Sequence, residues 1–276
     1  VITPRLAASW DAWPDGTLKL SYSTAFRAPS WDESDNATAR RIQADDLQPE
    51  TVRSFESSIH HRLGTHRLVL GGFYSRWEKL VELAALSDAE AIEAIRDGRT
   101  AVPFTPGIQL TQYRNTAGVT NYGMNTGIEG SFDSGRVLYG FTLTGAIAEK
   151  RTSAGTTRLP VAPQLFGNAR LAYVLGGKLP TIALASHFVG PRPADLSDGQ
   201  FQPDPYAETQ IRLKLTLTGQ APLLEGLTYR LMADYATADR GPYVVGPVTS
   251  AIPSQRTPQL VPLERFRAAM GVEYAF

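Results

Sequence analysis

Four histidines are the first candidates for catalysis or metal binding, because imidazole exchanges protons near neutral pH and is a common metal ligand. His60 and His61 are adjacent, and adjacent side chains of a strand point to opposite faces, so the two cannot chelate one ion in regular geometry. His66 and His187 have no partner at ligand spacing. No Ser, His and Asp residues fall at a consistent height along the elements described below. The sequence therefore predicts no metal site, no cofactor and no enzyme.

Charged side chains form a second set with possible chemistry. They recur at alternate positions within otherwise apolar runs, which places them on one face of a strand. They are Glu56, Arg62, Glu129, Arg170, Arg212, Lys214, Arg230, Asp234, Arg265, Arg267 and Glu273. What such a face can do depends on the elements that carry it.

The end of the chain shows the alternation most clearly. Over residues 266–276 every second residue is apolar or aromatic, and the residues between are small or charged. That pattern is typical of a strand of an outer-membrane β-barrel, with one face on lipid and the other in a wet interior. Tyr274 and Phe276 are similar to the terminal aromatic signal that barrel-assembly machinery recognises, so this machinery is an expected partner.

Composition limits the alternatives. No stretch approaches the roughly 18 consecutive apolar residues of a membrane helix, so only a closed barrel could span a bilayer. Basic and acidic residues number 27 each, which gives no indication of nucleic-acid binding. The absence of cysteine fits an exported protein without disulfides.

About eleven strands follow from the alternation, and the expected fold class is an all-β, antiparallel transmembrane β-barrel. The first two strands flank Asp15-Gly16, a hairpin signal. The connections alternate between short and long, as do the periplasmic turns and extracellular loops of bacterial barrels. The expected strands cover residues 5–13, 18–26, 51–63, 67–81, 119–132, 136–150, 164–175, 180–190, 211–217, 227–235 and 265–276.

One helix is expected within the long segment at residues 82–110. Ser87 is followed three residues later by Glu90, the spacing of a capping box, and then by Ala91, Ile92 and Ile95 before Gly98. The strand count is odd, whereas a complete single-chain bacterial barrel has an even number. With Phe276 in the periplasm, we therefore expect the chain to be the closing part of a larger barrel.

Several short motifs resemble the TonB-dependent outer-membrane receptors. The motifs are a strand ending in Phe-Arg-Ala-Pro, a following Leu-x-Pro-Glu, a strand carrying Glu, and later Tyr-x-Asn and Tyr-Gly-x-x-x-Gly-x-Glu. Their main residues are Phe26, Arg27, Ala28, Pro29, Leu47, Pro49, Glu50, Glu56, Asn115, Gly123 and Glu129.

This resemblance implies the C-terminal half of a 22-stranded barrel with an N-terminal plug, residues 1–276 being barrel without plug. It also implies location in the outer membrane of a Gram-negative bacterium, in contact with its lipid. The expected function is TonB-coupled uptake of a scarce ligand of the siderophore, cobalamin or carbohydrate class. The inner-membrane TonB complex would act through the missing N-terminal part, and the small-molecule ligand would bind the extracellular loops.

Each candidate residue has a plainer interpretation. The inward charges can pair with one another or with a plug, which we favour over a substrate path because Arg or Lys on the lipid face would cost about 2–4 kcal/mol at midplane. Pro29 can end strand pairing because it has no N–H, and it restricts Ala28 to an extended conformation. The rings of Trp10, Trp13, Trp77, Tyr139 and Tyr274 suit interfacial belts.

Recognition is expected in the long loops, since loops on a rigid scaffold carry binding residues. The loop candidates, besides the Ser87 helix, are Trp31, Arg40, Arg41, Phe104, Phe201, Tyr206, Tyr243 and Arg256. A passive porin or barrel adhesin of ten or twelve strands, without plug or energy coupling, is the alternative.

Overall fold

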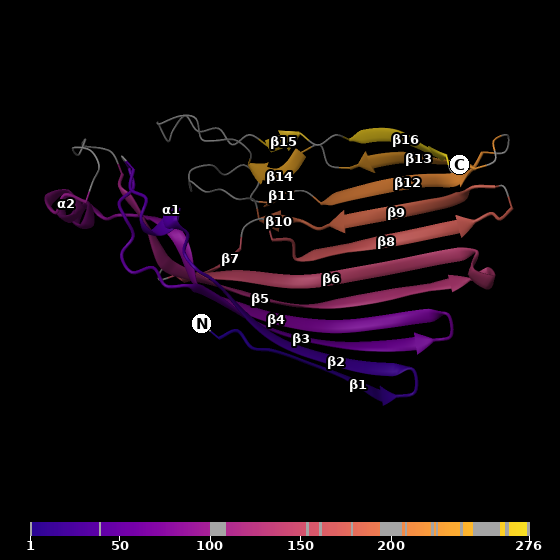
Figure 1. The fold of residues 1–276 in the computed structure, drawn as a ribbon, viewed down its shortest axis with the longest axis horizontal. Helices are drawn as coiled ribbons and strands as arrows, with labels where there is room; N and C mark the ends of the chain where they lie inside the picture. Colours follow the sequence, from indigo (N-terminus) through magenta and orange to yellow (C-terminus); the bar gives the residue numbers. More distant parts are fainter. Residues whose placement is uncertain are drawn as a thin grey trace.

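The computed structural model describes residues 2–38, 40–99, 109–152, 155–159, 162–177, 179–193, 206–207, 209–221, 224, 226–237, 240–244, 260–262 and 265–274. Eleven strands follow one another in a curved antiparallel meander, and neighbours in the chain are neighbours in the sheet (Figure 1). They are β1 (Arg5–Trp13), β2 (Gly16–Arg27), β3 (Glu50–Leu63), β4 (His66–Ala85), β5 (Thr111–Phe132), β6 (Val137–Thr152), β8 (Leu165–Val174), β9 (Thr181–Val189), β12 (Gln210–Gln220), β13 (Leu227–Ala236) and β16 (Phe266–Tyr274). The expected strand number is confirmed.

Smaller elements occupy the connections. The helices are α1 (Trp31–Ser34), α2 (Asp88–Arg96) and the 3-10 turn η1 (Asp133–Gly135). The short strands are β7 (Gly155–Arg158), β10 (Arg192–Pro193), β11 (Tyr206–Ala207), β14 (Arg240–Val244) and β15 (Leu260–Pro262). None of the helices in the described residues is long and apolar enough to cross a membrane.

Short and long connections lie at opposite ends of the sheet, as expected. Figure 1 shows α1 and α2 at one end of the strands and the tight turns at the other. In the first turn Asp15 has a left-handed φ of 62°, and the Trp13 ring covers Gly16, where a Cβ would come within 1.9 Å of it. Glycine is therefore required for this hairpin to close under the indole.

β4 and β5 are longer than the alternation predicts. The expected loop at residues 82–110 starts later, at residue 86, and β5 starts at Thr111 instead of residue 119, because residues 80–85 pair with residues 111–117 beyond an irregularity between Trp77 and Leu80. Lys79 has a φ of 59° there, and such a bulge interrupts the period-2 pattern. The two strands thus extend as a ribbon past the rest of the sheet.

The outer face of the sheet carries apolar and aromatic side chains. Strand register aligns one row of them, namely Leu6, Tyr22, Phe55, Tyr74, Tyr122 and Ile147, and we call these residues the upper aromatic row. Near the short turns, the rings of His66, Phe132 and Tyr139 pack with centroids 4.8–5.8 Å apart. Large apolar side chains between the two groups are exposed, for example Leu70 at 48% and Phe141 at 43%.

The inner face carries the polar set. By register, Glu56, Glu129, Arg170, Lys214 and Asp234 alternate with the outer-face residues on their strands. Within the described strands, β1 and β16 each pair on one side only, so the sheet is an open, partial barrel. The apolar residues therefore face outward and these five charged residues inward, as the alternation predicts.

Candidate functional site

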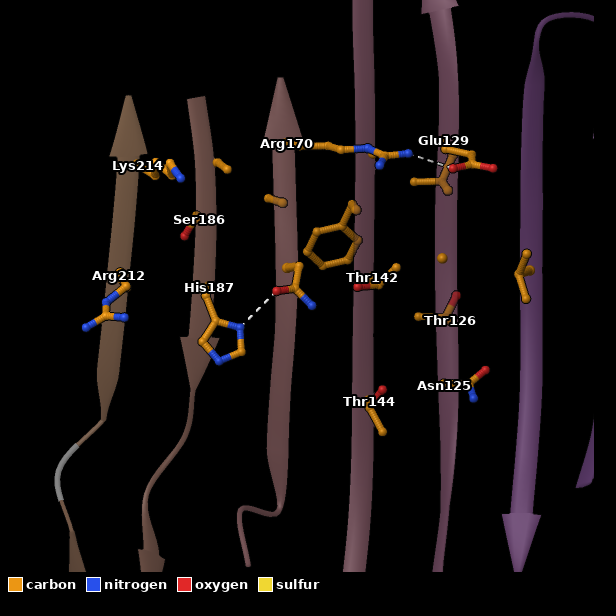
Figure 2. A pocket seen from close by; sticks show the side chains of 18 of the residues that line it. Asn125, Thr126, Glu129, Thr142, Thr144, Arg170, Ser186, His187, Arg212 and Lys214 are labelled. Atoms are coloured by element: carbon orange, nitrogen blue, oxygen red, sulfur yellow. Dashed lines mark hydrogen bonds and ion pairs between the residues drawn. The ribbon is translucent and has the colours of Figure 1, made fainter. Parts of the chain in front are cut away.

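A polar cleft of about 780 Å³ lies on the inner face and spans β4 to β13. Figure 2 shows side chains from these neighbouring strands reaching into it. Glu129 is the central carboxylate, because it accepts hydrogen bonds from Arg67 at 3.3 Å and from Arg170 at 2.8 Å. The lining of the cleft includes four cationic side chains (Arg67, Arg170, Arg212 and Lys214) but only two carboxylates (Glu129 and Asp234). The inner cleft therefore carries a net positive charge.

Arg170 reaches Glu129 across the intervening strand β6. Gly140 of β6 lies between them, and a Cβ at Gly140 would be 2.6 Å from Arg170 Nε. The absence of a side chain at this position is therefore what leaves a path for the guanidinium.

Substitution of Gly140 by valine should break this ion pair without unfolding the strand. The flexible Arg170 side chain can move aside, whereas the β6 backbone keeps its register. We expect the coupling energy between Arg170 and Glu129, about 0.2–1 kcal/mol for an exposed pair, to vanish in a double-mutant cycle made in the Gly140→Val background. The coupling between Arg67 and Glu129 should persist, and loss of both couplings would contradict this account.

The histidines lie where strand alternation placed them. His60 is on the inner face beside Ser58 and Arg67, at 3.0 and 3.2 Å, whereas His61 contacts Trp13 at 3.2 Å. His187 contacts Asn168 in the inner cleft at 2.8 Å (Figure 2). In the described part of the chain, no three His, Asp or Glu side chains gather as metal ligands would.

A second candidate region is a folded unit at the end with the long connections. It is formed by residues 28–49 and 86–110, as far as these are described, and we call it the loop unit. Ile42, Leu86, Ala94 and Leu110 are buried together in it, with Ala91 and Ile95 packed against them. These are most of the buried apolar side chains in the described residues, so the loop unit has a small hydrophobic core of its own.

The signature residue Arg27 joins this loop unit to the sheet. Its guanidinium donates to both oxygens of Glu50 at 2.7 and 2.8 Å, and to both oxygens of Glu33 at 2.8 and 3.0 Å. Glu33 also caps α1 together with Ser30, and Glu50 accepts the backbone N–H of Val81. Through this one side chain, β2, α1, β3 and β4 are connected. Sequence reasoning missed this ion pair and α1, although the Ser30 to Glu33 spacing is a capping box.

Asn115 is the second signature residue with a clear structural task. Its amide accepts from the Gln48 N–H at 2.8 Å and donates to the carbonyls of Gln48 and Lys79 at 2.9 and 2.6 Å. The Lys79 ammonium in turn contacts the Gln48 side chain. The segment that carries Leu47 and Pro49 is thereby attached to the β4 bulge.

Polar contacts connect the two halves of the loop unit to each other and to the start of β5. Gln112 is 2% exposed and donates to the Gln43 carbonyl and to Asp45, while it accepts from Arg114. Arg99 forms an ion pair with Asp45, and this contact keeps the pKa of Asp45 below its usual range. None of these residues was singled out from the sequence, because the contacts of Gln112 and Arg99 with residues 43–45 join positions 54–69 apart.

Glu90 connects the α2 cap to β5. The Ser87 N–H, the Ser87 hydroxyl and Arg114, in that order of importance, lower its pKa from 4.5 to about 2. Arg114 Nη1 donates to it at 2.7 Å. The expected helix and its cap are thus confirmed, and the carboxylate has an additional partner that the capping box did not predict.

Acidification should therefore loosen α2 through Glu90. Because the folded pKa is lower than the unfolded one, the stabilisation is fully present above about pH 4.5 and is lost as the pH falls toward 2. Hydrogen exchange of the α2 amides should accelerate over that range. In Glu90→Gln the exchange should already be faster at pH 6 and should change less with pH. An identical pH response in the two proteins would rule out Glu90 as the source.

The remaining signature residues are placed as follows. The strand β2 ends at Arg27, just before Ala28 and Pro29, as the plainer interpretation predicts. Gly123 lies under Phe73, where a Cβ would be 2.7 Å from Phe73 Cζ. Glu56 lines a second inner pocket. Phe26 is exposed, and Tyr274 ends β16.

Trp31 and Arg41 are loop candidates within the described residues. Trp31 is 69% exposed, and the Arg41 guanidinium lies over the Tyr113 ring, 5.0 Å from its centroid, and pairs with Asp32. Phe276 and the loop candidates Phe104, Phe201 and Arg256 lie outside the described residues, as do the side chains of Tyr206 and Tyr243.

The open meander, its apolar outer face and its polar inner cleft define the class of molecule as a membrane β-barrel, present in part. The chain matches the family model "TonB dependent receptor-like, beta-barrel" over residues 1–238. It therefore belongs to the TonB-dependent receptor β-barrel family, and its location is the Gram-negative outer membrane. A comparison with curated protein sequences gives no match.

Solved structures share the fold at low sequence identity. The copper transporter OprC aligns with a TM-score of 0.66 at 13% identity, over 99% of this chain and 39% of its own. The FrpB iron transporter from Neisseria meningitidis gives a TM-score of 0.60 at 13% identity, over 84% of this chain and 34% of its own. A mutant of the ferric enterobactin receptor PfeA from Pseudomonas aeruginosa gives 0.62 at 13% identity, over 84% and 34%. This chain thus spans about a third of the length of these transporters.

Proposed function

We propose that this chain is the C-terminal part of the barrel of a receptor that takes up a scarce small molecule across the outer membrane. Family membership carries the proposal, since the family model covers residues 1–238. In this proposal a plug domain fills the completed barrel, and the inner-membrane TonB complex supplies the energy through it. The chain itself has no catalytic role. The inner cleft and the loop unit are the parts of the path that it contributes.

The charge of the inner cleft favours an anionic ligand within the siderophore, cobalamin or carbohydrate classes. Four cationic side chains against two carboxylates attract negative charge into the cleft. Three of the similar structures are described as an iron transporter, a copper transporter and a ferric enterobactin receptor, and an iron chelate would fit the same charge. We therefore propose a ferric siderophore as the ligand class to test first.

The test is uptake of radiolabelled ferric siderophores by cells that express the intact gene product, with and without a functional TonB complex. We expect accumulation only when TonB is functional. Saturable uptake of labelled cobalamin or an oligosaccharide instead would keep the transport mechanism but change the ligand. Uptake that is independent of TonB, with a stable conductance in planar bilayers, would contradict the proposal and indicate a passive porin.

A further inference from the structure

Two arginines face each other on the outer side of the sheet, where the alternation otherwise predicts apolar residues. Arg53 of β3 and Arg76 of β4 are direct cross-strand partners, with side chains 63% and 49% exposed. Like charges in this position destabilise a strand pair. Glu78 contacts Arg76 at 3.0 Å and Arg53 at 3.8 Å, but one carboxylate compensates only one of the two charges.

A pocket adjoins this arginine pair. It has a volume of about 340 Å³, and its lining includes Arg76 and Glu78 of β4, Thr120 of β5 and Arg151 of β6. Arg151 is the cross-strand partner of Gly118 and forms no ion pair with any other described residue. The guanidinium groups of Arg76 and Arg151 therefore line the pocket together with the Glu78 carboxylate and the Thr120 hydroxyl, and Arg53 lies next to Arg76 on the neighbouring strand. We call Arg53, Arg76, Glu78, Thr120 and Arg151 the outer arginine site.

The position of this site relative to the membrane follows from strand geometry. On β5, Phe132 lies ten residues beyond Tyr122 of the upper aromatic row, about 33 Å along the strand. At a strand tilt of about 40°, this corresponds to about 25 Å along the membrane normal, the height of the apolar band of outer-membrane barrels. Arg53 and Arg76 lie two residues past the same row, about 7 Å further along their strands. The outer arginine site is therefore at the level of the lipid headgroups of the outer leaflet.

We propose that the outer arginine site binds a phosphate group of an anionic lipid in the outer leaflet. The planar guanidinium matches phosphate oxygens with paired N–H donors, and Thr120 can donate a further hydrogen bond. The rings of Phe55 and Tyr74, two cross-strand pairs below Arg53 and Arg76 on the same face, would contact the upper part of the acyl chains. A lipid is favoured over soluble phosphate because the site lies on the lipid-facing side, directly above these rings.

Binding of lipid A to the intact protein in detergent, followed by native mass spectrometry, tests the proposal. Wild-type protein should bind bis-phosphorylated lipid A, and the Arg76→Gln/Arg151→Gln variant should bind it at least about tenfold more weakly, since charge-assisted hydrogen bonds are lost. Fully dephosphorylated lipid A should bind the wild type as weakly as the intact lipid binds the variant. The matched control Arg40→Gln/Arg96→Gln, with the same change of charge on the loop unit, should bind as the wild type does.

The substitution Glu78→Gln separates binding from a general disturbance of the barrel. It removes the competing carboxylate, so the affinity for bis-phosphorylated lipid A should rise, whereas mere loss of structure would lower it. Equal affinity of wild type and the arginine variant, or undiminished binding of the dephosphorylated lipid, would overturn the proposal. So would full competition by millimolar inorganic phosphate, which would make soluble phosphate the ligand. These measurements do not depend on uptake, so they can fail or succeed independently of the proposed transport function.

Discussion

Replacement of Leu70 by arginine should destabilise the intact barrel by about 2–4 kcal/mol when it is folded in a lipid bilayer. Leu70 lies on the outer face of β4 between Ile59 and Thr126, and the protein leaves 48% of its surface uncovered. It is four residues from both His66 and Tyr74, which places it near the middle of the apolar band. A guanidinium at this depth must leave water without a partner, and that is the source of the penalty.

The neighbouring residue on the opposite face provides the matched control. Val69 pairs with His60 and Gly127 on the inner face, and Val69→Arg should change the free energy of unfolding by no more than about 1 kcal/mol, because a wet lumen hydrates the charge. Denaturant titration of both variants in the same vesicles measures the difference. Equal penalties, or a larger one for Val69→Arg, would mean that the two faces have been assigned the wrong way round.

Removal of Arg27 should have the second largest effect, confined to the loop unit. Arg27→Ala leaves Glu33 and Glu50, with side chains 15% and 14% exposed, facing each other without a cation. Loss of one partner of a buried ion pair costs roughly 3–5 kcal/mol, and partial exposure of Arg27 reduces this through screening to about 2–3 kcal/mol. The free energy of local opening of residues 28–38, obtained from hydrogen exchange or limited proteolysis, should fall by that amount.

Two further variants make this prediction specific. Arg27→Lys should recover only part of the loss, because an ammonium cannot donate in parallel pairs to two carboxylates. Arg96→Ala, whose exposed partners Glu93 and Asp97 lie on α2 or directly after it, should change local opening by less than about 0.5 kcal/mol. Unchanged protease resistance in Arg27→Ala would show that the loop core of Ile42, Leu86, Ala94 and Leu110 is sufficient on its own.

Much of the sheet could be read from local patterns, and the errors occur where a pattern is interrupted. The β1–β2 hairpin and the α2 cap at Ser87 were predictable because each depends on residues a few positions apart. The extension of β4 and β5 was not, since the irregularity at Trp77 to Leu80 breaks the alternation on which the prediction relied. The helix α1 was missed although its cap is local, because four residues give no periodicity to detect.

The sequence by itself determined the strands, their two faces and the alternation of short and long connections. These properties depend on side-chain direction along an extended chain, which repeats every two residues and needs no knowledge of distant partners. Only the tertiary structure decided which polar groups meet. Arg27 and Glu50 are 23 positions apart, and Asn115 and Gln48 are 67 apart. Their contacts depend on strand register and on a bulge in β4, and strand alternation specifies neither of them.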